Sequence, residues 1–144
     1  MGYIDNEFKI PRGAYIVVDG SYIHSTGETR YQVILNPSGE KLYESKIYKG
    51  GSSNLAEFLA IAEALYWCKE NNSKLDIYSD SHTAMTWVQK KKVKTKVVRG
   101  EKTKEILDET ILFLDWLFEN PINNRIIQWK TKLWGENPAD FGFK

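Results

Sequence analysis

Three strand-like segments near the start of the chain most limit what it can fold into. They are rich in β-branched and aromatic residues and span Ala14–Ile23, Thr29–Asn36 and Lys41–Tyr48. Between them stand STGE and NPSGE, which contain the residue types of tight turns. This spacing predicts an antiparallel meander of three neighbouring strands.

The rest of the chain alternates between helical and strand-like segments. Apolar residues at helical spacing predict a long helix for which Ser53 or Asn54 is the N-cap. The elements expected after the meander are a helix over Leu55–Lys69, a strand over Lys74–Ser79, a short helix directly after Asp80, a helix over Glu101–Phe118 and a strand over Arg125–Trp129. The order βββαβααβ is typical of an α/β fold, with a five-stranded sheet that is antiparallel and then parallel, flanked by helices.

Length and composition exclude several classes of protein. A chain of 144 residues is the size of one domain, so we expect a single domain in which residues 1–13 form an N-terminal extension. Cys68 is the only cysteine, which excludes an internal disulfide and a zinc site built from several cysteines. No apolar run reaches the roughly 20 residues of a membrane span, and the start has no signal-peptide pattern. We therefore expect a cytoplasmic protein with no membrane partner.

Asp19 stands in the middle of the strand-like run YIVVDGSY, where a buried carboxylate costs several kcal/mol unless it has a partner. Three further acids are placed so that they could meet it at one end of the sheet. Glu57 lies near the start of the long helix, Asp80 follows the fourth strand, and Asp140 comes after the fifth. Four carboxylates without His or Cys favour Mg²⁺ or Mn²⁺ as their shared partner.

Each of these acids also has a structural interpretation. Asp80 could cap the helix that follows it, Glu57 could be a first-turn acid favoured by the helix dipole, and Asp140 could be a solvated tail residue. Asp19 is the hardest to explain in this way. The set of four is therefore better explained by a metal site than by four separate structural roles.

Four segments carry a resemblance to a known family. They are VVDGSY, SSNLAEFLAIAEAL, IYSDSHTAMTWV and WKTKLWGENPADFGFK, which together span the chain from about Ala14 to its end. In order and spacing they resemble type 1 ribonuclease H, an enzyme that cuts the RNA strand of an RNA–DNA hybrid. The likeness is greatest to bacterial members that end in WGE-x-x-AD-aromatic-G. Such members often carry an N-terminal hybrid-binding domain, and with only about a dozen residues before its first strand this chain is expected to lack it.

The resemblance implies a two-metal endoribonuclease of ribonuclease H-like fold. Two Mg²⁺ ions, with Mn²⁺ as a substitute, would be held by Asp19, Glu57, Asp80 and Asp140, and Asp19 would contact both. The products would carry 5′-phosphate and 3′-hydroxyl ends. Glu136 takes the place of a mobile His that assists proton transfer and product release in other members. The implied partner is an RNA–DNA hybrid bound by a monomer that has no organic cofactor.

Contacts to the hybrid are implied by the same resemblance. Ser53, Asn54 and His82 match positions that read the RNA strand. The matches on the DNA side are Ser52, Asn54, Thr95 and Lys96 in a phosphate pocket, Trp87 along the DNA track, and the loop residue Thr131. Trp87 could equally be a core residue. The first hairpin, SYIHSTGE, departs from the family's Asn-Pro-Gly pattern.

A lysine-rich run over Gln89–Lys96 is expected to supply electrostatic contact with the DNA backbone, although such runs are more often solvated surface. Two alternatives of other classes stay open at this point. One is a catalytically silent hybrid-binding module, and the other is a DNA-directed nuclease or strand-transfer enzyme of the same broad fold.

Overall fold

The computed structural model describes residues 11–141, whose centre is a five-stranded sheet. Its strands are β1 (Tyr15–Tyr22), β2 (Thr29–Asn36), β3 (Glu40–Glu44), β4 (Ile77–Ser79) and β5 (Ile126–Gln128), in the order β3-β2-β1-β4-β5. The pairs β1–β2 and β2–β3 are antiparallel, whereas β1–β4 and β4–β5 are parallel. This confirms the predicted mixed sheet, with β1 at its centre.

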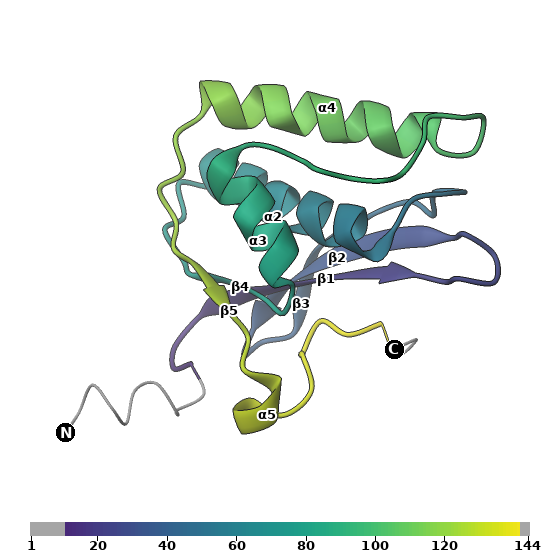
Figure 1. Ribbon diagram of the computed structural model, residues 1–144. Coiled ribbons are helices and arrows are strands. Elements are labelled where there is room, and N and C mark those ends of the chain that lie inside the picture. Colours follow the sequence, from purple (N-terminus) through teal and green to yellow (C-terminus); the bar gives the residue numbers. More distant parts are fainter. Residues whose placement is uncertain (1–10, 142–144) are drawn as a thin grey trace.

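Helices cover the sheet unequally. The helices are α2 (Ser53–Glu70), α3 (His82–Lys90), α4 (Lys104–Glu119) and α5 (Thr131–Trp134). In Figure 1, α2 and α3 lie above the sheet with α4 outermost, while α5 and the segment after it lie below. Within the part of the chain that is described, no helix combines the length and apolar character needed to cross a membrane.

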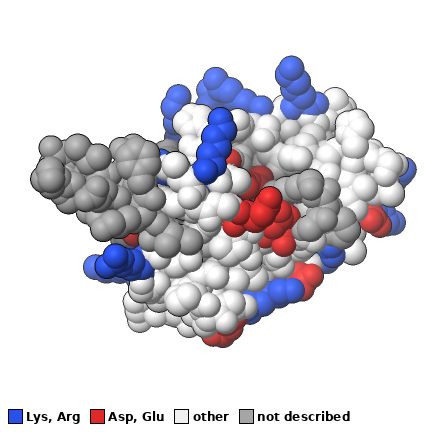
Figure 2. Space-filling model, turned by 90° about the horizontal axis from the view of Figure 1, so that it is seen from below, with Lys and Arg blue, Asp and Glu red and all other residues white. Residues whose placement is uncertain are grey.

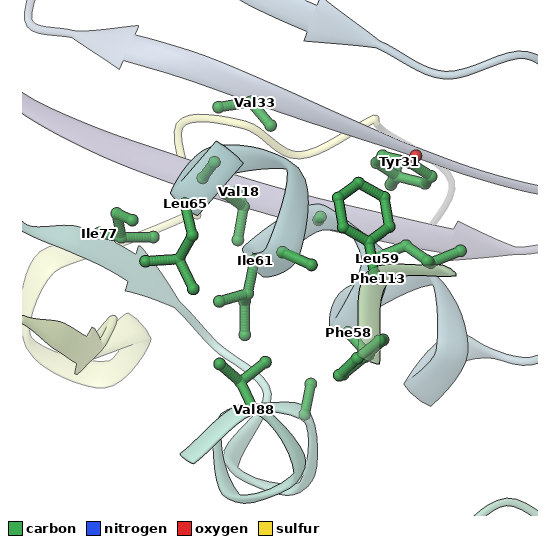
Figure 3. Close-up of a cluster of buried hydrophobic side chains, with 14 of the residues drawn as sticks. Val18, Tyr31, Val33, Phe58, Leu59, Ile61, Leu65, Ile77, Val88 and Phe113 are labelled. Atoms are coloured by element: carbon green, nitrogen blue, oxygen red, sulfur yellow. The ribbon is translucent and has the colours of Figure 1, made fainter. Parts of the chain in front are cut away.

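The alternation of β1 supplies both faces of the sheet with buried residues. Ile16 and Val18 belong to the larger core cluster, which lies between the sheet and the helices. Tyr15 and Val17 point to the opposite face, where Trp129 packs with them. The side chains in Figure 3 show the larger cluster, in which residues of the sheet meet those of α2, α3 and α4. Burial on both faces explains why the sequence of β1 is almost continuously apolar. Asp19 is the one charged residue in this buried strand.

Several predicted boundaries differ from the structure. The third strand ends at Glu44, and beyond it Tyr48 pairs with the sheet only through an isolated bridge to Thr29. The β2–β3 register also shifts between Val33 and Ile34. The N-cap of α2 is Ser52, whose Oγ accepts a hydrogen bond from Leu55 N at 3.1 Å, so the prediction of Ser53 or Asn54 is wrong. The helix α5 was not predicted, since its four residues are too short for a periodic pattern.

Candidate active site

Asp19 occupies the central strand close to where β4 diverges from it. The pairing of β1 with β4 covers Ile16 and Val17, and Asp19 follows two residues after the last of these. Asp19 is fully buried. Its position places a carboxylate at the carboxyl end of the parallel part of the sheet, where α/β folds form their ligand sites.

Close contact between β1 and α2 brings Glu57 to the same place. A Cβ on Gly20 would lie 2.6 Å from backbone atoms of Ala56 and Glu57, so only glycine permits this approach. The Gly20 N–H donates a hydrogen bond to Glu57 Oε1. Glu57 is 4% exposed and lies beyond the first turn of α2, which contains no acid. The interpretation of Glu57 as a first-turn acid is therefore wrong.

Asp80 follows β4 directly and is partly exposed. The residue that caps α3 is Ser81, whose Oγ accepts a hydrogen bond from Ala84 N at 3.1 Å. Because Ser81 fills this role, the cap interpretation of Asp80 is wrong. Asp80 is thus left available for chemistry at the end of the strand.

Oxygen atoms of Asp19, Glu57 and Asp80 come within 4.8 Å of one another. Carboxylates this close repel one another strongly in a low-dielectric surrounding, and a divalent cation removes that cost. The donor set consists of hard oxygen atoms without His or Cys, which fits Mg²⁺ or Mn²⁺ and does not fit a structural zinc site. A surface pocket of about 390 Å³ opens onto this cluster and is lined by Glu57 and Asp80.

Asp140 lies outside the cluster of three, on the loop after α5. Its backbone N–H donates to Asn137 O at 3.0 Å, and Ala139 before it is buried. Glu136 is exposed on the same loop. Asn137 is buried and donates to Val18 O at 3.1 Å, and sequence reasoning missed it. Figure 2 shows acidic side chains gathered near the middle of the face seen from below.

Most of the residues predicted to contact nucleic acid line two adjoining pockets. A second pocket of about 520 Å³ brings together all four residues of the predicted phosphate pocket with Trp87. Its lining is Ser52, Asn54, Thr83, Trp87, Lys94, Thr95, Lys96 and Val97. Asn54 and Ser53 also line the pocket at the carboxylates, so Asn54 belongs to both. Lys94 belongs to the lysine-rich run that was expected to contact the DNA backbone, whereas Thr83 and Val97 were not predicted.

The other two predicted contacts, His82 and Thr131, line neither pocket, and Thr131 lies on a short helix where a loop was expected. His82 is exposed at the first residue of α3, and Thr131 is exposed at the first residue of α5. Trp87 is 8% exposed and its ring lies 6.5 Å from that of Phe58. Trp87 therefore combines both interpretations, since it packs in the core and also lines the pocket.

The lysine-rich run is an ordered edge of the second pocket. After α3 ends, Lys91 adopts a left-handed conformation with φ of 54°, and a segment without helix or strand follows. Val93 and Val97 pack on the core, while Lys92, Lys94 and Lys96 are exposed between and beside them. The two valines thus hold the segment against the core and leave these three lysines exposed to solvent.

Comparison with known proteins gives the chain a family. The sequence model of the RNase H family matches residues 12–132, which include the three clustered carboxylates and exclude Glu136 and Asp140. An RNase H1 isolated from compost by a metagenomic approach, LC11, is 19% identical over 85% of this chain and 87% of that chain, with a TM-score of 0.55.

Two further solved structures are similar. The RNase H1 of the halophilic archaeon Halobacterium salinarum is 14% identical over 83% of this chain and 86% of that chain, with a TM-score of 0.53. LC11 in complex with an RNA/DNA hybrid is 18% identical over 85% of this chain and 89% of that chain, with a TM-score of 0.50. At these identities the structural likeness shows the fold, and the family match over most of the chain shows the membership. The protein belongs to the RNase H family.

Proposed function

We propose that this protein is an endoribonuclease that hydrolyses the RNA strand of RNA–DNA hybrids and leaves 5′-phosphate and 3′-hydroxyl ends. The observation that carries the proposal is the cluster of Asp19, Glu57 and Asp80, two of which line a surface pocket, in a chain of the RNase H family. We further propose that residues 1–144 contain one catalytic domain of the type 1 kind, which acts as a monomer in the cytoplasm.

The four predicted carboxylates would hold two Mg²⁺ ions, with Mn²⁺ as a substitute. Bound there, the ions would supply an activated water and charge stabilisation at the scissile phosphate and the leaving 3′ oxygen. Asp19 and Glu57 are held rigidly, since one lies in the central strand and the other on a helix fixed against it by Gly20. Asp80 and the loop of Asp140 would complete the two sites from the other side.

The two adjoining pockets suggest how a hybrid would be oriented. Ser53 and Asn54 next to the carboxylates would bind the RNA strand, together with His82 at the start of α3. Ser52, Thr95 and Lys96 in the second pocket would bind a DNA phosphate. Because Asn54 lines both pockets, the start of α2 would lie between the two strands and set the distance from the DNA phosphate to the cleaved bond. Trp87 and Thr131 would add contacts on the DNA side.

The test compares labelled RNA–DNA hybrid, double-stranded RNA and double-stranded DNA, each with Mg²⁺, Mn²⁺ or excess chelator. Cleavage of the RNA strand of the hybrid in either metal, and none in chelator, is the expected result. Asp80→Asn should be inactive, whereas Asp115→Asn, at an exposed acid on α4, should cut like the unchanged protein. Binding without cleavage would indicate a silent module, and cleavage of double-stranded DNA a DNA-directed nuclease.

A further inference from the structure

Asn137 uses its whole side chain amide to hold the loop after α5 against the site. It is 5% exposed. Its Oδ1 accepts a hydrogen bond from Ala139 N at 2.7 Å, which closes a tight turn in the loop. Its Nδ2 donates to Val18 O at 3.1 Å and reaches Asp80 Oδ2 at 3.4 Å. A primary amide has two N–H donors, and both are used here.

The two acceptors of that amide belong to different strands. Val18 O is the carbonyl of the peptide bond that leads into Asp19, and Asp80 follows the end of β4. The β1–β4 pairing stops at Val17, so the two strands have no ladder bond at this level. Asn137 Nδ2 bridges them where the ladder has ended. One side chain therefore ties the peptide bond before Asp19 to the carboxylate of Asp80.

The same loop is held from the other side of β1. Gln32 pairs with Asp19 across the β1–β2 ladder, and its Nε2 donates to Ala139 O. Within the loop, Asp140 N donates to Asn137 O at 3.0 Å. Two hydrogen bonds thus fix the position of the Asp140 backbone relative to Asp19. One runs from Asn137 to β1, and the other runs from Gln32 on β2 to the residue before Asp140.

We propose that Asn137 is a positioning residue of the metal site. It fixes the carboxylate of Asp80 and the loop that carries Asp140 relative to Asp19. An amide suits this place because the two acceptors there require two N–H donors, which a carboxylate or a hydroxyl of this length does not supply. Groups that orient metal ligands typically change metal affinity or activity by about 10- to 100-fold when they are removed. The catalytic part of the inference rests on the proposed function, whereas the metal-binding part does not.

Two variants separate positioning from turn formation. In Asn137→Ser the hydroxyl can still accept from Ala139 N, but it cannot reach Val18 O and Asp80, while Asn137→Ala removes all three side-chain hydrogen bonds. Asn124→Ala is the matched control. Asn124 Nδ2 also bridges two carbonyls, Ser73 O at 3.1 Å and Leu75 O at 2.9 Å, before the opposite end of β4.

The experiment measures Mn²⁺ affinity by calorimetry on each metal-free protein, below its unfolding temperature, followed by kcat and KM on the hybrid. Asn137→Ser and Asn137→Ala should both weaken Mn²⁺ binding by about tenfold or more and lower kcat with little change in KM. Asn124→Ala should lower thermal stability and leave Mn²⁺ affinity and kcat unchanged. When Asp140→Asn is already present, Asn137→Ser should reduce Mn²⁺ affinity by a smaller factor than it does in the otherwise unchanged protein.

The outcomes are distinguishable. If Asn137→Ser binds Mn²⁺ and turns over hybrid like the unchanged protein, the positioning role is overturned and Asn137 only forms the turn. Equal Mn²⁺ losses in Asn137→Ser and Asn124→Ala would also overturn it, since they would reflect general loosening of the fold. If the unchanged protein cuts no hybrid, the proposed function fails, and the Mn²⁺ titrations still decide the role of Asn137.

Discussion

The backbone N–H of Gly20 donates a hydrogen bond to Oε1 of Glu57, at the point where α2 crosses β1. The two elements can meet there because Gly20 has no side chain: a Cβ would lie 2.6 Å from the backbone of Ala56 and Glu57. The residue after Asp19 thus fixes both the separation of strand and helix and the orientation of a second carboxylate. Fold and candidate chemistry depend on the same contact.

Gly20→Ala should therefore lower both stability and metal binding. The added methyl meets backbone atoms that cannot move aside separately, so we expect a loss of about 1–3 kcal/mol in the free energy of unfolding. Gly100→Ala is the control, because the nearest atom to its Cβ would be 3.9 Å away, and its effect should stay within about 0.5 kcal/mol. Urea denaturation measures the change in the free energy of unfolding for the two variants. An unchanged urea midpoint for Gly20→Ala would show that α2 and β1 separate without cost.

Asp19→Asn and Asp80→Asn should each remove most turnover while the fold stays intact. Each substitution takes one charge out of a cluster whose oxygens lie within 4.8 Å, so repulsion falls and thermal stability in metal-free buffer should stay level or rise. Thermal unfolding with and without Mg²⁺ checks this, and added Mg²⁺ should stabilise the variants less than the unchanged protein. Unfolding of either variant in metal-free buffer would mean that its carboxylate is structural.

Much of the fold and part of the site follow from local signals in the sequence. The turn residues between the first strands and the helical spacing of apolar residues sufficed to predict the mixed sheet and its long helices. Asp19, Glu57 and Asp80 could be placed because each lies on a regular element or directly after one. The early end of β3 and its register shift against β2 could not be predicted, since both depend on pairing with another strand.

Asn137 shows why the rest of the site could not be predicted. An Asn before Pro in a short loop is typical of an exposed turn, and nothing in its neighbourhood indicates burial. Its burial results from the way the loop returns under the sheet, where Trp129 and Trp134 lie with ring centroids 5.0 Å apart and Trp129 Nε1 donates to Gly135 O at 3.0 Å. Such long-range contacts leave no periodic trace in the sequence.

Neutralising Lys91, Lys92, Lys94 and Lys96 together should weaken hybrid binding and flatten its salt dependence. Each phosphate contact that is lost removes about 0.9 from the slope of log affinity against log salt concentration for a duplex. The control neutralises four other exposed lysines, Lys41, Lys46, Lys69 and Lys74, which lie on or near β3 and around the end of α2. Fluorescence anisotropy over a salt series measures both slopes. Equal slopes for the two variants would show that the run is only solvated surface.

Glu63 should make stability depend on pH. Burial raises the pKa of Glu63 to about 7, and nearby Glu109 adds to the rise, while the hydrogen bond that Tyr31 OH donates at 3.3 Å opposes it. A raised carboxyl pKa means that the folded state favours the protonated form. The stability that this contributes is therefore complete below the ordinary value of 4.5 and is lost as pH rises to about 7.

Glu63→Gln should accordingly stabilise the protein at about pH 8 by on the order of 1 kcal/mol, and by much less at about pH 5. The gain is reduced because solvent reaches part of the side chain. Glu70→Gln, at the exposed end of the same helix, is the control and should give no pH-dependent gain. Urea denaturation at the two pH values measures the difference. A gain in stability for Glu63→Gln that is equal at the two pH values would contradict the raised pKa.

Glu136 is exposed on the loop held by Asn137, outside the cluster of three carboxylates, and is proposed to assist proton transfer and product release. Glu136→Gln should then lower steady-state turnover by about 10- to 100-fold, in the range of general acid–base contributions. Hybrid affinity in Ca²⁺, which should support binding without cleavage, should barely change. If product release is the affected step, single-turnover cleavage should fall less than multiple-turnover cleavage.

Paired burst and steady-state measurements on Glu136→Gln distinguish three roles for this side chain. Glu119→Gln, at an exposed acid at the end of α4, is the matched control and should leave both phases unchanged. A loss as complete as that of Asp19→Asn, together with weaker Mn²⁺ binding, would make Glu136 a metal ligand. Rates equal to those of the control would leave it a surface acid. A smaller loss in the burst than in the steady state, with Mn²⁺ affinity intact, would support the release role, because only the step after cleavage would then be slowed.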